Sequence, residues 1–443
     1  MKLNEKKFFE LANENGFESA DLTSSEASSL SVSIFHGEID SLTNNSSYEL
    51  VARGIYKGKM GSISVDNVDK DSPEFLVKEI KRAASIIEND DPVFIFKGSE
   101  KYHKKQISKN IDFSVNIKEK VGILLEIEKK LLGFDKRINE VVTVGFDSSS
   151  HVYKKTNSYG LKLSQKMNTY SYFAEVTAKN GDEIRTGYKV FASCDENEFN
   201  IDKFVEEVAT NALEKLGSIQ CTSSKFPVVL NPDCVATLVS FLISSLDAEE
   251  VQKHTSLLEG KLNQQVLSKK LTVIENPLEK NIFFRYFDDE GVATNKKFLI
   301  KKGVISTYLY TLQTAAKDHV EPTGNGYGQG AKSKADVGYV VIKPGKKSEE
   351  EMLSTIKEGV YITELSGLHS GMNPHSGNFS LQCAGFMIRD GKKAKPLALI
   401  TVAGNLINVF NNIKCVANNS KLVLHNQMSA PSIYVGKMTI SGK

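Results

Sequence analysis

The chain has 443 residues, enough for two or three domains, and 40% of them are hydrophobic. Its 56 basic and 54 acidic residues leave a formal net charge of only +2. This balance gives no strong attraction to nucleic acid or anionic membranes, and an ordinary 25% share of charged residues argues against disorder.

The cysteine pattern and the N-terminal segment favour a cytoplasmic protein. The five cysteines are odd in number and none has the Cys-x-x-Cys spacing, so we expect neither a disulfide framework nor a structural zinc knuckle. The first ten residues are polar and rich in lysine, unlike a signal peptide. No apolar run approaches the length that crosses a bilayer, so we expect no membrane association.

The first segment of the chain predicts a helix followed by strands. Residues 4–15 predict a short helix that Asn4 caps and Gly16 ends. From residue 30 to 65, short apolar stretches predict a meander of antiparallel strands. The expected breaks in it are His36-Gly37, Arg53-Gly54 and Lys57-Gly58.

Three amphipathic helices and further strands follow. Apolar residues at helical spacing predict helices near residues 76–87, 121–132 and 202–216. Between the last two of these, the segment 141–153 predicts a hairpin and 161–178 predicts one long strand.

A polar segment, residues 217–225, separates the last of these helices from a new strand at 226–230. We place a domain boundary there, giving an N-terminal domain over residues 1–220 and a C-terminal domain over 221–443. Further strands are predicted at 282–287, 297–300, 304–310, 338–342, 381–388 and 396–402, with a hairpin turn at Asp390-Gly391 and short helices at 349–357 and 406–413. The pattern predicts an α+β fold with two domains, each pairing mostly antiparallel sheet with helices.

The histidines lack the spacing of a helical metal site. No two of the eight are four or five residues apart, and both HExxH and HExxxH are absent. The closest pair, His369 and His375, lies in a loop, where Asp288 or Asp289 could supply a third ligand. Hydrogen bonds to backbone or water are the alternative for both histidines.

Two other segments are candidates for a site. The adjacent carboxylates Asp288, Asp289 and Glu290 could share a proton or bind a cation, or they could end a strand in a turn that Arg285 neutralises. The glycine-dense segment 324–330 lacks the Lys-Ser/Thr end of a phosphate loop. It predicts a loop that exposes its backbone, with a plain turn as the alternative. Neither a GxSxG elbow nor a reactive-cysteine signature is present.

Four blocks in the second half resemble the TldD/PmbA peptidase family, whose members were once described as modulators of DNA gyrase. In the family's order they are 287–294 (FDDEGVAT), 314–326 (TAA followed by EPTGNG), 367–380 (GLHSGMN followed by SGNFS) and 400–406 (ITVAGNL). The resemblance extends over nearly the whole chain. It implies a protein of dimeric or larger assemblies that mature or degrade peptides.

The resemblance also locates a metal helix. In TldD-type members a helix at the start of the second domain carries HExxxH, whose histidines bind zinc and whose glutamate is the base, and a cysteine near the C-terminus completes the site. The equivalent helix here follows Asn231 as cap and Pro232 as first residue. Its residues 239–246 read VSFLISSL, without imidazole or carboxylate, and Cys415 comes too early to be the ligand cysteine. The resemblance therefore points to the PmbA-type branch, and we expect this helix to serve packing alone.

We therefore predict a non-catalytic or regulatory subunit of a TldD/PmbA-type proteolytic assembly. It would help to admit unfolded peptide while a TldD-type partner supplies the zinc, and it would have no catalytic residue, metal ligand or cofactor of its own. The isolated chain is expected to form a homodimer. The residues expected to contact peptide are Asp288, Asp289, Glu290, Thr323, Gly324, Asn325, Gly326, His369, Asn373, His375 and Asn378.

Two alternatives belong to other classes of function. One is an independent peptidase or hydrolase with a site rebuilt from Asp288, Asp289, Glu290, His369 and His375. The other is a modulator of DNA gyrase or another regulatory binding protein. The near-neutral charge and the lack of nucleic-acid motifs argue against direct binding to DNA.

Overall fold

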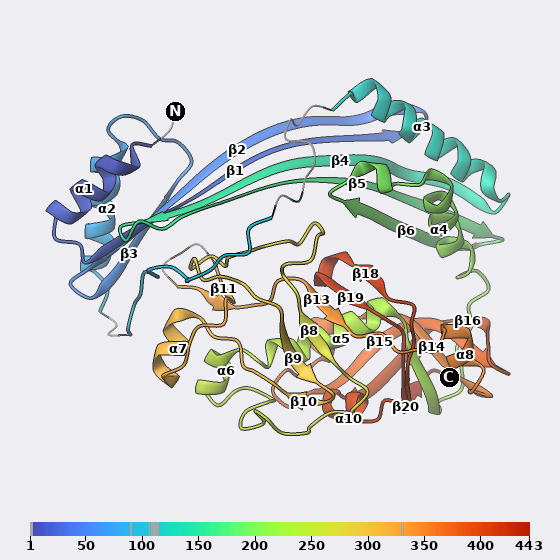
Figure 1. Cartoon of the computed structure of the whole chain (residues 1–443). Helices are drawn as coiled ribbons and strands as arrows, with labels where there is room; N and C mark the ends of the chain where they lie inside the picture. Colours follow the sequence, from blue (N-terminus) through green and yellow to red (C-terminus); the bar gives the residue numbers. More distant parts are fainter. Residues whose placement is uncertain (1–2, 89–90, 106, 108–114, 329, 331) are drawn as a thin grey trace.

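The computed structural model describes residues 3–88, 91–105, 107, 115–328, 330 and 332–443. Long strands of the first half arch over the second half of the chain, as Figure 1 shows. Two helices cover each end of the arch: α1 (Glu5–Glu14) and α2 (Ser72–Ser85) at one end, α3 (Ile117–Phe134) and α4 (Ile201–Leu213) at the other. The predicted α+β fold with mostly antiparallel sheet is confirmed.

The first half contains one six-stranded antiparallel sheet in the order β3-β2-β1-β4-β5-β6. Its strands are β1 (Ser19–Phe35), β2 (Glu38–Tyr56), β3 (Lys59–Val65), β4 (Ile138–Asn157), β5 (Lys162–Asn180) and β6 (Glu183–Ser193). Turns at His36-Gly37 and Lys57-Gly58 are confirmed, with φ of 78° at Gly37 and 72° at Gly58. Strand β3 pairs with β2 only over Leu50–Tyr56, so the outer edge of the rest of β2 has no strand partner among the described residues.

Two separate cores lie on the same face of this sheet. Side chains alternate along a strand, so Leu22 and Val32 of β1 share a face. Leu22 packs in a core with residues of α1 and α2, whereas Val32 packs in a core with α3 and α4. Between the two cores this face carries the polar residues Ser24, Glu26 and Ser28 of β1. In Figure 1 the helices among the described residues of the first half lie over the two ends of the sheet rather than over its middle.

Two turns predicted in the first half are wrong. Arg53-Gly54 lies inside β2, because the absent side chain of Gly54 makes room for the Phe17 ring; an added Cβ would be 2.5 Å from Phe17 Cδ1. The hairpin predicted at 141–153 is instead part of the single strand β4. Its serines continue the pairing with β5, and Gly145 accommodates the Phe173 ring, which an added Cβ would approach to 2.0 Å.

The second half has two more six-stranded sheets. One has the order β16-β15-β14-β7-β20-β17 and the other β10-β9-β8-β13-β19-β18; β7–β14 and β13–β19 are the parallel pairs. The strands are β7 (Ser224–Leu230), β8 (Val273–Glu275), β9 (Lys297–Lys301), β10 (Val304–Ile305), β13 (Val340–Ile342), β14 (Glu358–Ser366), β15 (Asn378–Arg389), β16 (Lys392–Asn405), β17 (Cys415–Val416), β18 (Lys421–Val423), β19 (Met428–Ala430) and β20 (Ile433–Ser441). A short pair, β11 (Gly326–Tyr327) and β12 (Lys334–Ala335), stands apart.

Helix α5 (Pro232–Ser244) packs against β14 of one sheet and β19 of the other. The remaining helices are short: α6 (Ala248–Gln252), α7 (Leu312–Asp318), α8 (Glu349–Leu353), α9 (Leu368–Gly371) and α10 (Leu406–Asn411). Of the helices that the structure describes, none is both long and apolar enough to cross a membrane.

Two strand predictions in the second half need correction. Residues 282–287 form no strand; apart from one bridge between Phe287 and Ala293, the backbone there is irregular. Three aromatic side chains of this segment, Phe284, Tyr286 and Phe287, are buried in a core shared with Tyr153 and Leu163 of the first sheet. The strand predicted at 304–310 shrinks to β10. The hairpin at Asp390-Gly391 is confirmed, and the division at residue 220 stays a prediction.

Candidate functional site

Helix α5 positions the candidate site. Asn231 Oδ1 accepts the N–H of Cys234 at 2.8 Å, and Pro232 occupies the first turn, where its missing N–H costs nothing. Leu238 and Leu242 are fully buried in the core between the two sheets. These contacts fix the rotation of the helix and therefore the direction of its other face.

The other face of α5 borders open space. Asp233, Thr237, Ser240 and Ser244 recur every three or four residues and so share one face. Ser240 and Ser244 line a cleft of about 660 Å³. The expectation that this helix serves packing alone is therefore wrong for this face.

Charged side chains from α6 and β12 line the same cleft. Glu249 pairs with Lys253 at 2.8 Å and with Lys332 at 2.5 Å. Asp247 Oδ1 accepts the N–H of Glu249 at 2.8 Å, and burial raises the pKa of Asp247 to about 6. With four carboxylates and three ammonium groups in its lining, the cleft is nearly balanced in charge.

The donors that α5 offers do not suit zinc. Ser240 Oγ donates to Thr237 O at 2.7 Å and Ser244 Oγ donates to Phe241 O at 2.9 Å. Neutral hydroxyls held by their own helix are poor substitutes for two imidazole nitrogens. Within the part of the chain that the structure describes, no three His, Cys, Asp or Glu side chains lie close enough together to hold a metal ion.

The grouping of His369 and His375 with Asp288 or Asp289 is accordingly not found. His375 Nδ1 instead lies 2.8 Å from the carbonyl oxygen of Thr255, which is the backbone-bonding alternative. His369 is exposed on α9. The structure therefore brings no metal site together from these residues.

The acidic segment 288–290 is buried and held by backbone groups. Asp288 Oδ1 accepts the N–H of Glu290 at 3.0 Å and of Val292 at 2.8 Å, and Oδ2 accepts the N–H of Gly326 at 2.8 Å. Burial, and next the neighbouring Glu290, raise the pKa of Asp288 to about 8. No part of the Asp288 side chain is exposed to solvent, so its hydrogen bonds stabilise the internal structure of the chain.

Asp289 ties the acidic segment to the first sheet. It accepts a hydrogen bond from the Tyr153 hydroxyl of β4 at 2.7 Å and from the N–H of Gly328 at 2.7 Å. Arg285 forms an ion pair with it, which agrees with the alternative in which Arg285 neutralises this segment. Burial alone would raise the pKa of Asp289, but the Arg285 guanidinium and these hydrogen bonds lower it on balance.

The glycine-dense segment lies directly against these acids. Gly324 has φ of +71°, and an added Cβ would be 2.7 Å from Ala293 O. An added Cβ at Gly326 would be 2.2 Å from Glu290 Oε2. Gly324 and Gly326 are buried against the acidic segment of the same chain, so the predicted exposure of the loop backbone is wrong at these two positions. Gln329 lies outside the described residues.

Asn325 and Thr323 are also held internally. Asn325 Nδ2 donates to both carboxylate oxygens of Glu275, at 3.0 and 3.1 Å, and the Asn325 side chain is fully buried. Thr323 Oγ1 accepts the N–H of Tyr310 at 2.8 Å. These residues shape the loop around the acidic segment.

The other predicted contact residues are exposed. His369, Asn373, His375 and Asn378 lie on the segment from α9 to the start of β15. His375 alone of these four lines the α5 cleft. The eleven residues predicted to contact peptide thus fall into a buried or half-buried group around Asp288 and an exposed group on the segment from α9 to β15. Their contact with peptide stays a prediction.

Sequence reasoning missed most of the cleft. The carboxylates after α5 look like a solvated helix end in the sequence, and the lysines before and in β12 show no motif. They meet only because α6 and β12 fold toward the open face of α5. The cleft residues without a usable sequence signal are Asp247, Glu249, Lys253, Lys332 and Lys334.

Three consecutive segments match profiles of known domains. Residues 20–86 match PmbA/TldA metallopeptidase domain 1, residues 111–216 its central domain and residues 223–442 its C-terminal domain. The chain belongs to the PmbA/TldD metallopeptidase family. Relatives in this family include the metalloprotease PmbA of Escherichia coli O157:H7, 25% identical over 438 residues, which are 96% of this chain and 92% of that protein. A metalloprotease of Methanocaldococcus jannaschii is 26% identical over 406 residues, 88% of this chain and 87% of its own.

Solved structures of PmbA/TldD relatives have the same fold. A Thermotoga maritima protein described as a candidate modulator of a DNA gyrase superposes with a TM-score of 0.89 at 28% identity, over 99% of both chains. TldE from Thermococcus kodakarensis superposes with a TM-score of 0.90 at 21% identity, over 99% of this chain and 100% of that one. The second likeness shows the fold alone.

Proposed function

We propose that the chain is a PmbA- or TldE-like subunit of a TldD-type proteolytic assembly, acting on unfolded peptides in maturation or degradation. The observation that carries the proposal is the open face of α5. Where the family resemblance expects HExxxH, this face presents Ser240 and Ser244, whose hydroxyls bond to their own helix. A TldD-type partner would supply the zinc and the general base, and this chain would bind and position peptide.

The α5 cleft suits that role. Its volume of about 660 Å³ accommodates part of an extended peptide, and its ion pairs leave little net charge to select one side chain. Main-chain hydrogen bonds give affinity for unfolded peptide without reading its sequence. Of the predicted contact residues, His375 lines the cleft and is the best placed to bond a peptide, while the buried group around Asp288 would hold the neighbouring loop in shape.

We also propose a location and an assembly state for the chain. We place the protein in the cytoplasm, which agrees with five cysteines that are all free thiols. The isolated chain is proposed to form a homodimer, and it is not proposed to bind nucleic acid.

The test compares the chain alone, a TldD-type protein from the same genome alone, and the two together. An unstructured peptide should be cleaved by the mixture, with zinc bound stoichiometrically by the partner. Robust cleavage by the metal-free isolated chain refutes the subunit role. Light scattering should report a dimer of the isolated chain, and a monomer mass at tens of micromolar (about the range that detects ordinary interfaces) contradicts that part of the proposal.

A substitution in the cleft connects the test to this site. Ser240→Tyr should narrow the cleft and lower cleavage by the mixture about tenfold, equivalent to 1.4 kcal/mol of transition-state binding. Ser240→Ala is the matched control, because the hydroxyl bonds only within its helix, and it should leave the rate unchanged. Equal cleavage rates for the two variants would show that peptide does not bind in this cleft.

A further inference from the structure

Among the described residues, no strand covers a long, uncharged stretch of the outer edge of β2. Its pairing with β3 stops at Leu50, and the only partner that the described residues give to Ser41–Tyr48 is β1 on the inner side. This run reads SLTNNSSY, without lysine or proline. Proteins usually protect an open edge with charges, proline or a covering segment, because its backbone groups are a template for another strand.

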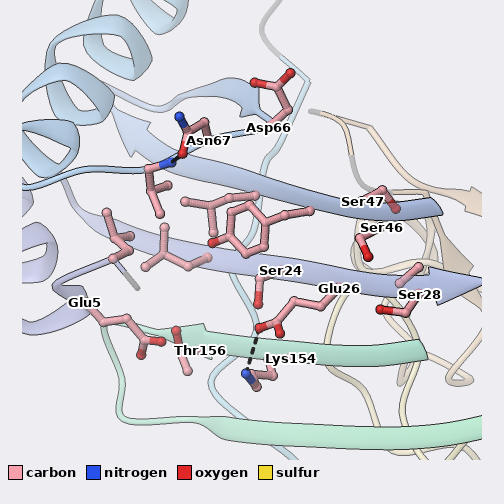
Figure 2. Close-up of a pocket in the computed structure, with 16 residues that line it drawn as sticks. Glu5, Ser24, Glu26, Ser28, Ser46, Ser47, Asp66, Asn67, Lys154 and Thr156 are labelled. Carbon is pink, nitrogen blue, oxygen red and sulfur yellow. Dashed lines mark hydrogen bonds and ion pairs between the residues drawn. The ribbon is translucent and has the colours of Figure 1, made fainter. Parts of the chain in front are cut away.

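A cleft of about 680 Å³ opens beside this edge, at the place where β3 ends (Figure 2). Ser46 and Tyr48 line it from the edge itself and Glu26 from β1. Glu5, in the first turn of α1, and Asp66, the residue after β3, complete its acidic lining. The cleft thus lies next to the position that a strand continuing the line of β3 would occupy.

The described residues of the cleft carry an excess of negative charge. Glu5, Glu26 and Asp66 contribute three carboxylates, and Lys154 contributes the only ammonium group among the described residues of the lining. Lys154 Nζ already pairs with Glu26 Oε1 at 3.0 Å. Burial, and then the charges of Glu26 and Glu5, raise the pKa of the Tyr48 hydroxyl, which agrees with both carboxylates facing this residue.

The register of the sheet places alternate side chains in the cleft. Tyr48 is opposite Glu26 and Ser46 is opposite Ser28, and residues directly opposite each other project from the same face. A strand added outside β2 would alternate in the same way. Every second side chain of that strand would therefore point to the face on which the acidic cleft opens.

We propose that the open edge of β2 from Ser41 to Tyr48 binds an extended, basic peptide segment as an added strand, with a lysine or arginine side chain in the cleft beside Glu5, Glu26 and Asp66. This inference rests on the proposed function, since it specifies a class of unfolded peptide that the subunit would hold. The site is on the face of the first sheet that carries α1 and α2, separate from the α5 cleft.

Charge favours a basic peptide over a second copy of the chain. Two copies of this edge paired antiparallel about Asn44 and Asn45 would bring Asp40 opposite Glu49. Like charges directly opposite destabilise a strand pair. A lysine-bearing strand would instead be attracted, because the described residues of the cleft include three carboxylates and one ammonium group.

The test uses the isolated full chain and two labelled ten-residue peptides, one alternating threonine with lysine and the other threonine with glutamate. Fluorescence polarisation should show the lysine peptide binding at least about tenfold more tightly, with affinity falling as salt screens the charges. Glu5→Gln combined with Asp66→Lys should weaken the lysine peptide about tenfold. Asp182→Lys, an exposed charge reversal at the β5–β6 turn, is the matched control and should change nothing.

Proline variants test the edge itself. The N–H groups of neighbouring residues in a strand point to opposite edges. One of the variants Ser46→Pro and Ser47→Pro therefore removes an N–H group at the open edge of β2, and the other removes an N–H group that faces β1 and breaks that pairing. The variant that keeps the wild-type circular dichroism and melting temperature should lose peptide binding. Unchanged binding by that folded variant, or equal binding of both peptides, overturns the proposal.

The remaining outcomes separate this inference from its alternatives. If the folded proline variant converts a dimer to a monomer while neither peptide binds the wild type, the edge belongs to a second copy and the peptide proposal is wrong. If no peptide binds the isolated chain but the mixture with a TldD-type partner cleaves peptide, this inference fails and the proposed function stands. If the lysine peptide binds the edge but the mixture cleaves nothing, this inference stands and the proposed function fails.

Discussion

Gly326 and Asp288 join two segments that are distant in the sequence. Gly326 N–H donates to Asp288 Oδ2 at 2.8 Å, and the N–H of Asp289 donates back to Gly326 O at 2.9 Å. An added Cβ at residue 326 would lie 2.2 Å from Glu290 Oε2, so any larger residue forces the acidic segment away. The glycine-dense loop therefore depends on the acids, and the acids depend on the loop.

Gly326→Ala should lower the free energy of unfolding by about 1–3 kcal/mol, because the new methyl group overpacks a buried site. Urea unfolding followed by circular dichroism measures the change. Gly330→Ala is the matched control in the same loop, since its Cβ would meet nothing within 4 Å, and it should stay within about 0.5 kcal/mol of the wild type. Equal losses in the two variants would contradict the packing argument.

At the scale of single residues, the sequence predicted the helix caps but not the environment of the acids. Asn4 and Asn231 both accept the expected backbone N–H groups, because a cap depends on the next three residues only. In the sequence Asp289 looks like an exposed residue of a turn, yet the hydroxyl that donates to it belongs to Tyr153, 136 residues away in the chain. A partner at that separation leaves no local pattern.

At the scale of elements, predictions succeeded where the signal was local. The cap of helix α5 and the turn of the β15–β16 hairpin are each determined by residues within a few positions in the sequence. The predictions for segments 141–153 and 282–287 were wrong because the conformation of their glycine, serine and aromatic residues depends on contacts with other strands. The same limit applies to the cleft, where α5 was recognised but the elements that complete the cleft were not.

The open face of α5 makes a second prediction. Ser240→His combined with Ser244→His places two imidazoles four residues apart, yet we expect neither stoichiometric zinc nor peptide cleavage. The neighbouring carboxylates of the cleft are already engaged, Glu249 with two lysines and Asp247 with a backbone N–H. Elemental analysis and a peptidase assay check this expectation. Stoichiometric zinc binding together with peptide cleavage would contradict it and show that the site lacks only its imidazoles.

Stability provides the control for that experiment. The two serines border the cleft, so the double variant should cost less than about 1 kcal/mol. Leu238→His on the same helix would bury an unpaired polar group and create a packing defect, at a cost of about 2–5 kcal/mol. Comparable losses would mean that α5 has no open face.

At the scale of the whole molecule, buried charges connect the two halves of the chain. Lys155 of β4 donates to Asp21 of β1 at 2.8 Å, and Arg53 of β2 binds the same carboxylate. Arg53 Nη1 also donates to the carbonyl of Gly330 at 3.3 Å, in the loop beside the acidic segment. The first sheet and the glycine-dense loop therefore share one desolvated network of charges.

Lys155→Met tests this network, because removing one member leaves Asp21 buried with Arg53 as its remaining cation. We expect a loss of about 3 kcal/mol in the free energy of unfolding. The loss should reach both halves, so hydrogen exchange should accelerate in β1 and β4 and also in residues 324–328. Lys154→Met is the control: the neighbouring side chain points to the other face, its ion pair with Glu26 is partly exposed, and its removal should cost at most about 1 kcal/mol. Faster exchange confined to the first sheet would show that the two halves are stabilised independently.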